Sequence, residues 1–398
     1  MTILDKIKNK TIYSNKYKTD SEAVVIACYF NPKNNPYRLK AFNIFYDSIK
    51  HLNHRIIECV IGDSKPQLEE NENIKRITTP SLLWHKESLL NMIISELPES
   101  FKYVFWVDTD VIFTNKNWLV DGVTELKIND VIQPFEYCVH LEKDELKPSF
   151  PYHSFKRTVN ENNEKGVIPT MWRSFCANYV KHIDLANDLD YNKHGHVGFA
   201  WGAKRSVLDR IKLYDRALIG GADHIIAHAA VGQINHNCIT KSFTENINEV
   251  NAWSERFYRI VNGRVGYVSG DLFHIWHGDI TKRQYLKRIQ DFTPKIKEIS
   301  KKDKNGLHVT DDDTYVNQYF DNREVKDDGF VDSLVAGYLT NSTIMGTMMG
   351  GNITGAMLGD ALNSSEDNNT QNTHNNHNSN NTTDSNYFDT NTSSENFS

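Results

Sequence analysis

The sequence predicts an α/β fold built on a doubly wound, largely parallel sheet, and three observations carry that prediction. Apolar runs of strand length alternate with longer runs of helical periodicity over roughly the first hundred residues. Such strand–helix–strand alternation favours parallel strands joined by crossover helices. The chain has 398 residues, of which 39% are hydrophobic and 11% aromatic, so it can bury one large core or two ordinary ones.

The elements are assigned in chain order from these runs. Residues 23–30 (AVVIACYF) form a buried strand that ends at the Asn31-Pro32 turn. Residues 37–52 have helical apolar spacing, residues 56–61 form a second strand that ends at Gly62-Asp63, and residues 74–77 form a short third strand. Residues 81–97 form a helix, and residues 101–107 form the next strand. Further strands are expected at 131–137 and 197–201, near the start of a second half.

The strand at 101–107 is followed by two carboxylates one residue apart, Asp108 and Asp110, after which apolar residues resume. Asp is disfavoured in strands, and burial of an ionised carboxylate costs several kcal/mol unless it is paired or bound to metal. Ligand sites of open α/β sheets lie at the carboxyl ends of strands, where this pair falls. Alternate carboxylates at such a place can hold a hard divalent cation that binds a diphosphate.

The helix before this strand begins with the stretch Trp84-His-Lys-Glu-Ser-Leu-Leu-Asn91. Lys86 could meet a phosphate, and Asn91 a sugar or ribose hydroxyl, although the two share a helix face only loosely. Without the neighbouring carboxylates, a solvated Lys-Glu face would explain the pattern equally well.

A glycine pair and an acid occur together in the second half, at Gly220, Gly221 and Asp223, ahead of an apolar helical stretch at 225–231. The glycines let the backbone approach a ligand closely. Asp223 could be the N-cap of that helix, worth about 1 kcal/mol and the commoner role on geometry alone. It could instead be a general base that deprotonates a hydroxyl. Trp201, in a predicted strand, is either a core residue or a platform on which a sugar stacks.

The stretch HIWHG brings His274 and His277 close together, with Arg283 and Arg288 soon after them. A neutral imidazole is a suitable third ligand for Mn²⁺, which accepts mixed nitrogen and oxygen donors. A core or surface role would suit either histidine alone. The pair, in a chain that also has an Asp-x-Asp, favours a late metal ligand.

The chain resembles an uncharacterised group of GT-A-fold, Asp-x-Asp-containing glycosyltransferases found in bacteria and large DNA viruses. The resemblance covers about residues 22–330 and lies in the order of the stretches FNP, LWHKESLLN, FWVDTDVIF, VIQPF, HVGFAWGAKRSVLDRIKLYD, GGADHIIAHA, VGYVSG and HIWHGD. The glycine turn is GGAD where similar sequences have GGGD, and Asp327 replaces a Glu in the closing motif; both departures keep the acid.

The resemblance implies a GT-A fold, in which a Rossmann-like, nucleotide-sugar-binding half is continuous with an acceptor-binding half. It implies a metal-dependent hexosyltransferase that moves a sugar from a nucleoside diphosphate sugar to a hydroxyl acceptor, which is a glycan, a lipid-linked glycan or a protein. Mn²⁺ or Mg²⁺ would be bound by Asp108, Asp110 and His277, with His274 as the weaker choice. Asp223 would be the general base of an inverting displacement, although retaining enzymes can place an acid similarly. The nucleotide-sugar site would comprise Asp108, which also touches ribose, and Tyr29, Asn31, Asp63, Lys86, Asn91, Trp201, Gly220 and Gly221.

Other functions share parts of this pattern. A sugar nucleotidyltransferase would have the same fold and metal-binding acids, but the stretch CYFNPKNN lacks the Gly-rich basic loop expected after the first strand. A metal-dependent hydrolase would need more carboxylates than the two that can be placed. A catalytically inactive glycan- or partner-binding module would not need an intact Asp-x-Asp and GGAD.

Composition limits the class of partner and indicates how the chain is divided into segments. The net charge of −6 and the pI near 6.2 argue against a nucleic-acid partner. Five scattered cysteines without C-x-x-C spacing are typical of buried thiols in a reducing compartment. We expect a flexible leader at 1–20 and a GT-A domain at 21–330. An uncharged, glycine-spaced segment follows at 331–362 and is not expected to span a membrane. Residues 363–398 are expected to form a disordered, low-complexity tail rich in Asn, Ser and Thr. No signal peptide is evident, so a cytoplasmic location is expected, in the host cytoplasm if the tail reflects a viral rather than a protist genome.

Overall fold

The computed structural model describes residues 17–148, 171–187, 194–278, 298–299 and 301–311. The chain divides into two units, Met1–Val325 and Lys326–Ser398, and every described residue belongs to the first. The predicted boundaries at 330 and 362 therefore lie outside the described residues, as do the segments that follow them. The predicted leader is described only from Tyr17, whose buried hydroxyl donates a 2.9 Å hydrogen bond to the Phe113 carbonyl. The end of that leader thus packs against the domain.

A large mixed sheet forms the centre of the described unit. Its seven strands are ordered β10-β6-β9-β4-β1-β2-β3. The strands are β1 (Ala23–Phe30), β2 (His54–Ile61), β3 (Ile74–Thr79), β4 (Tyr103–Val107), β6 (Val131–Gln133), β9 (Ala200–Lys204) and β10 (Val265–Tyr267). β3, β2, β1 and β4 run parallel, which confirms the α/β half predicted from the sequence.

Two strand predictions in the second half were wrong. The stretch 131–137 is not one strand, because β6 belongs to the large sheet and Tyr137 begins β7 of a second sheet. The strand predicted at 197–201 begins only at Ala200, and β9 runs antiparallel to both β4 and β6. Phe199 has a positive φ of 78°, which an extended strand cannot include, so the strand starts directly after it.

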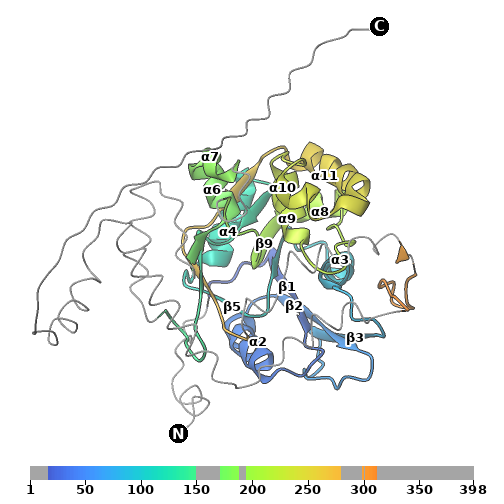
Figure 1. The fold of residues 1–398 in the computed structure, drawn as a ribbon. Helices are drawn as coiled ribbons and strands as arrows, with labels where there is room; N and C mark the ends of the chain where they lie inside the picture. The colour runs from blue at the N-terminus through green and yellow to red at the C-terminus, as the bar shows by residue number, and fades with distance from the viewer. Residues whose placement is uncertain (1–16, 149–170, 188–193, 279–297, 300, 312–398) are drawn as a thin grey trace, which may run out of the picture. The chain divides into compact units, whose positions relative to one another are not determined.

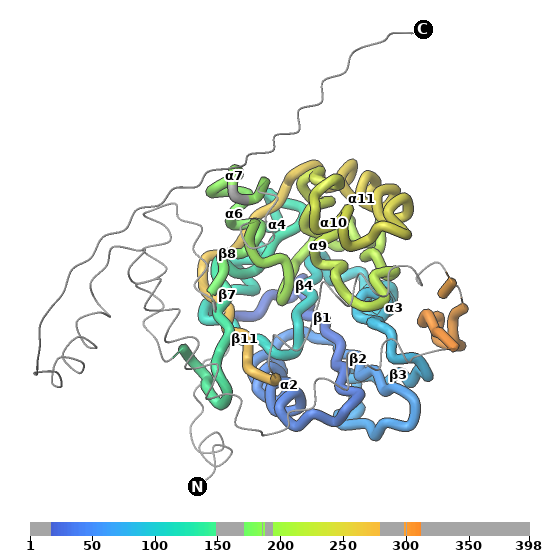
Figure 2. Tube along the Cα trace, viewed as in Figure 1, coloured from blue at the N-terminus to red at the C-terminus, as the bar shows by residue number. Residues whose placement is uncertain are grey.

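The second sheet has the order β5-β11-β7-β8. Its strands are β5 (Val111–Phe113), β7 (Tyr137–His140), β8 (Met171–Arg173) and β11 (Asp271–His274). β11 lies between β5, to which it is antiparallel, and β7, to which it is parallel. Figure 2 shows β7, β8 and β11 side by side although they come from distant parts of the sequence.

Helices cover both faces of the large sheet, as doubly wound folds require. They are α2 (Pro36–Ile49), α3 (Lys86–Glu96), α4 (Trp118–Ile128), α6 (Phe175–Lys181), α7 (Ile183–Ala186), α8 (Arg205–Arg210), α9 (Ala222–Ala230), α10 (Asn237–Thr240) and α11 (Ile247–Val261), with a 3₁₀ turn at Thr244–Asn246. Figure 1 shows α8 to α11 gathered on one side, away from α2. Within the part of the chain that the structure describes, no helix has the length and apolar character needed to cross a membrane.

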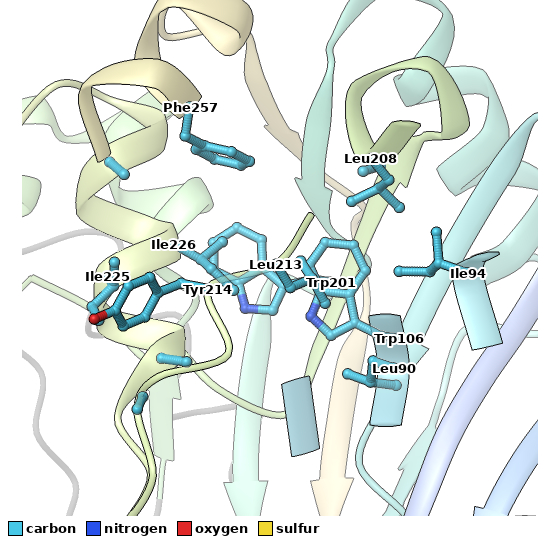
Figure 3. Close-up of a cluster of buried hydrophobic side chains, with 14 of the residues drawn as sticks. Leu90, Ile94, Trp106, Trp201, Leu208, Leu213, Tyr214, Ile225, Ile226 and Phe257 are labelled. Carbon is cyan, nitrogen blue, oxygen red and sulfur yellow. The ribbon is translucent and has the colours of Figure 1, made fainter. Parts of the chain in front are cut away.

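Alternating side chains of β4 build the two cores between these layers. Val104 and Trp106 join the core formed with α3, α8, α9 and α11, whereas Phe105 and Val107 join the core formed with α2 and α4. The first core contains Trp106 stacked near Trp201, among side chains of the covering helices (Figure 3). β4 is therefore buried on both faces, which fixes the place where it ends.

Candidate active site and metal ligands

The Asp-Thr-Asp turn joins the two sheets. β4 ends at Val107 in the large sheet and β5 begins at Val111 in the second sheet, so Asp108 and Asp110 lie on the short connection between them. The Asp108 N–H donates a 2.7 Å hydrogen bond to the Phe199 carbonyl, which continues the β4–β9 ladder by one residue. Both carboxylates are therefore held by a backbone that two sheets constrain.

The register of the second sheet brings two histidines to Asp110. His274 pairs with Val111, and the next N–H along the chain, that of Ile275, donates a 2.8 Å hydrogen bond to the Asp110 carbonyl. As a result, His277 Nε2 lies 2.9 Å from Asp110 Oδ2, and His274 Nε2 lies 3.7 Å from the same oxygen. Both histidines that the sequence offered as candidate ligands therefore lie beside Asp110, with His277 the nearer.

These three side chains have the chemistry of a divalent-cation site. One ligand atom from each of Asp110, His274 and His277 lies within 4.8 Å of the other two. The second oxygen of Asp110, Oδ1, is buried and has no hydrogen-bond partner among the described residues, so a ligand could satisfy it. Burial by itself favours a raised pKa for Asp110, but His274 and His277 outweigh burial and hold that pKa well below its usual value. The carboxylate is therefore ionised, as metal binding requires.

Lys86 links the first carboxylate of the turn to Asp223. Its Nζ lies 2.7 Å from Asp108 Oδ1 and 3.4 Å from Asp223 Oδ2, and its side chain is 9% exposed. Burial favours a lower pKa for Lys86, but Asp108 and Asp223 outweigh it and hold the pKa well above its usual value. Burial raises the pKa of Asp108 to about 6 even though Lys86 opposes that rise. The ammonium is thus fixed at the first turn of α3, between the carboxylates of Asp108 and Asp223.

Asp223 is not the cap of its helix. Gly221 occupies the N-cap position of α9 with φ 96°, and no side chain caps this end. Gly220 also has a positive φ, of 97°, so the turn before α9 requires both glycines. Asp223, one residue into the helix, directs Oδ2 toward Lys86, while Oδ1 is buried without a hydrogen-bond partner among the described residues. The interpretation of Asp223 as an N-cap, which geometry alone favoured, was therefore wrong.

A pocket lies at the carboxyl ends of β1 and β2. Asn31 donates to the Tyr29 hydroxyl at 3.1 Å and to Gln67 Oε1 at 2.7 Å, and the Tyr29 hydroxyl donates to the same Gln67 oxygen at 2.6 Å. The lining residues are Tyr29, Asn31, Pro32, Glu58, Cys59, Val60, Ile61, Ser64, Lys65 and Gln67. Tyr29 and Asn31, two of the candidate nucleotide-binding residues, therefore lie together at this pocket. Asp63 is exposed in the turn after β2 and is not among the lining residues.

Two predicted donor-binding residues have structural roles instead. Trp201 is fully buried, donates from Nε1 to the Val197 carbonyl at 2.8 Å and packs near Trp106 in the core, so no face of its indole is open to a sugar. Asn91 is buried, and its amide both donates to and accepts from the backbone of Leu213, at 2.9 and 3.0 Å. These bonds account for both side chains, and we leave them out of the site.

Comparison with solved structures gives distant likenesses. No protein-family model matches the chain, and no curated protein matches it. A mutant of Drosophila β1,4-galactosyltransferase 7, in complex with manganese, UDP-Gal and xylobiose, is similar at 10% identity over 66% of this chain and 74% of that chain, with a TM-score of 0.31. Glucosyl-3-phosphoglycerate synthase from Mycobacterium tuberculosis, in complex with Mn²⁺, UDP-glucose and glycerol 3-phosphate, is similar at 9% identity over 69% of this chain and 78% of that chain, with a TM-score of 0.31.

Sequence inspection missed a group of side chains beside the turn. Phe199 stacks on His196 at 4.1 Å between ring centroids and on His274 at 4.9 Å. Gly198 lies between His196 and Phe199 in the sequence. It faces Asp223, because a Cβ built on it would lie 3.5 Å from Asp223 Oδ2. The stretch His196-Val-Gly-Phe199 contains the histidine, glycine and phenylalanine of this group, and its letters alone give no sign that they meet Asp223 and His274.

Proposed function

We propose that this chain is a metal-dependent glycosyltransferase with a GT-A fold, which transfers a sugar from a nucleoside diphosphate sugar to a hydroxyl acceptor with inversion. The observation that carries the proposal is the convergence at one turn. Asp110 lies beside His274 and His277, and Lys86 contacts both Asp108 and Asp223. An acid–histidine set for a cation, a fixed ammonium and a further carboxylate are the parts that such a transfer needs.

Mn²⁺ or Mg²⁺ would be held by Asp110, His277 and His274, with Asp108 contributing the oxygen that does not face Lys86. The mixed nitrogen and oxygen donors fit Mn²⁺ better than Mg²⁺, which prefers oxygen ligands. When bound, the cation would neutralise the charge of the donor diphosphate. Lys86, whose Nζ is buried between two carboxylates, would add a second positive charge near the phosphates.

The nucleoside would occupy the pocket at the ends of β1 and β2. Tyr29 and Asn31 present a hydroxyl and an amide that Gln67 already orients. Prearranged polar groups of this kind suit the edge of a base or a ribose. Asp63, exposed in the adjoining turn, stays a candidate for contact with the nucleoside from the solvent side.

Asp223 would be the general base. Its Oδ1 is buried and free of hydrogen bonds within the described part of the chain, so it can accept the proton of an acceptor hydroxyl. Gly198 leaves room beside it, because a side chain there would contact both Asp223 and His196. A base on the acceptor side supports a single displacement, and therefore inversion at the anomeric carbon.

The test is a screen of nucleoside diphosphate sugars with Mn²⁺, followed by product analysis on each one that stabilises the protein. The proposal expects release of a nucleoside diphosphate and transfer of the sugar. Release of pyrophosphate would identify a nucleotidyltransferase. Stabilisation without turnover, in the presence of a panel of hydroxyl acceptors and of water, would identify a binding module.

A further inference from the structure

A second cluster of metal-ligating side chains lies apart from the Asp110 set. It comprises His194, His224, His228 and Cys238, and one ligand atom from each lies within 4.8 Å of all the others. It shares no residue with the cluster of Asp110, His274 and His277. None of its members has a role in the proposed transfer.

Three separate pieces of chain supply these residues. His224 and His228 are four residues apart on α9, so they project from the same helix face. Cys238 lies on α10, whose N-cap His236 accepts a hydrogen bond from the Cys238 N–H at 3.2 Å. His194 precedes β9, and its Nε2 lies 3.2 Å from Cys238 Sγ. The cluster therefore connects α9 with α10 and with the segment that precedes β9.

In two of the histidines, a carbonyl oxygen determines which ring nitrogen carries the proton, because such an oxygen can only accept a hydrogen bond. His194 Nδ1 lies 2.9 Å from the Gly195 carbonyl. His228 Nδ1 lies 2.9 Å from Gln233 Oε1, and the Gln233 amide nitrogen donates to Asn187. Each ring must therefore carry its proton on Nδ1 and present the lone pair of Nε2 to the cluster. Histidines that bind metals are typically oriented in this way, by a carbonyl or carboxylate on the other nitrogen.

The surroundings of these histidines also favour the neutral imidazole, which can bind a metal ion, over the protonated form. His228 is fully buried, and its Nε2 has no hydrogen-bond partner among the described residues. Burial, with the neighbouring histidines His236 and His194, holds the pKa of His228 well below its usual value. Burial likewise, with His194 and His196, lowers the pKa of His224. Neutral imidazoles are the form that binds a metal.

We propose that His194, His224, His228 and Cys238 form a structural zinc site of three nitrogens and one sulfur. Thiolate and imidazole together select Zn²⁺ over the hard cations that suit the Asp110 set. With Zn–N bonds of about 2.0–2.1 Å and a Zn–S bond of about 2.3 Å, a tetrahedral site has ligand atoms about 3.3–3.6 Å apart. The His194–Cys238 pair is already near that separation. On binding, the Cys238 thiol loses its proton to solvent as the Zn–S bond forms.

Such a site would act on the active site through α9. His224 follows Asp223 directly in the first turn of that helix. Because the zinc would fix His224 and His228 to α10 and to the segment before β9, it would hold the turn from which Asp223 reaches Lys86. The four protein ligands would complete the tetrahedron, which is typical of structural rather than catalytic zinc.

The test is the zinc content of the full-length protein, produced in zinc-supplemented medium and freed of loosely bound metal by brief chelation. We expect about one Zn²⁺ per chain, lost in Cys238→Ala and in His228→Ala. Cys176→Ala, which removes a buried thiol from the neighbouring helix α6, should keep the zinc. Asp110→Ala should keep it too, because that residue belongs to the other cluster; this variant separates the zinc proposal from the proposed transfer.

If Cys238→Ala or His228→Ala does not fold, X-ray absorption at the zinc edge of the wild-type protein decides instead. The proposal predicts a first shell of one sulfur and three nitrogens. A wild-type protein without zinc, zinc lost with Asp110→Ala instead, or a zinc shell without sulfur would each overturn it.

Discussion

Replacement of Asp223 by Asn separates its proposed chemistry from any structural role. Asn keeps the size and polarity of Asp but cannot accept a proton from a hydroxyl. Because Gly221 caps α9 and no side chain does, the substitution removes no cap bond. Lys86 keeps its closer partner, Asp108, at 2.7 Å, against 3.4 Å for Asp223. We therefore expect little loss of stability and unchanged binding of donor and metal.

The rate of transfer should fall much further. Loss of a general base typically reduces a rate by about 10²–10⁴-fold, which corresponds to about 2.7–5.5 kcal/mol of transition-state stabilisation. The assay is steady-state transfer from the donor that the screen identifies, with donor affinity measured separately by thermal shift.

Asp215→Asn is the matched control. It changes a nearby, partly buried carboxylate on the segment before the glycine turn, which has no place in the proposed chemistry. It should leave transfer near the wild-type rate. Near-normal transfer by Asp223→Asn, with intact folding and donor binding, would refute the assignment of the base.

Four further substitutions test other parts of the account. His277→Ala should raise the Mn²⁺ concentration needed for half-maximal activity more than His274→Ala does, because His277 is nearer to Asp110, at 2.9 Å against 3.7 Å. The reverse order in a metal titration would show that His274 is the main ligand. Gly198→Ala should lower transfer to an acceptor more than hydrolysis of the donor by water, since its Cβ would lie 3.3 Å from His196 Cε1 and 3.5 Å from Asp223 Oδ2; equal loss of both reactions would place the acceptor elsewhere. Burial, with Lys302 and Arg216 nearby, lowers the pKa of His308 from 6.5 to about 4. The unfolded chain then binds the proton first, so the free energy of unfolding should decrease as the pH falls from about 6.5 to about 4. His308→Gln should weaken that decrease in denaturant titrations, and identical pH profiles would contradict the argument.

Local patterns were enough to predict the parallel half of the fold and the Asp turn. The strand at Ala23–Phe30 was predicted to the residue, because its apolar run ends at a turn that needs no tertiary information. The position of Asp110 shortly after the end of β4 followed from the same kind of pattern. The partnership of Asp110 with His277 could be suggested only by analogy, since it depends on the register of β11 against β5.

The rest of the site depends on contacts between distant segments. Nothing in the sequence shows that Leu213 would satisfy the amide of Asn91, or that Trp201 would be enclosed in the core. The start of β9 was misplaced because a positive φ at Phe199 is imposed by its surroundings rather than by the residue type. The proposed zinc ligands could not be predicted from the sequence either, because His194 and Cys238 become neighbours only through the packing of α9 and α10.

The most direct test of the central claim is the Mn²⁺-dependent stabilisation of the protein by its nucleotide, compared between wild type and Asp110→Ala. A nucleotide at 100 times its dissociation constant should stabilise the wild-type protein by about 2.7 kcal/mol. Asp209→Ala, which removes an exposed carboxylate paired with Arg205, should keep that gain. The account predicts that folded Asp110→Ala loses the Mn²⁺-dependent part of the stabilisation. An unchanged gain in Asp110→Ala would contradict the account, because the nucleotide and its metal would then bind without the Asp-Thr-Asp turn.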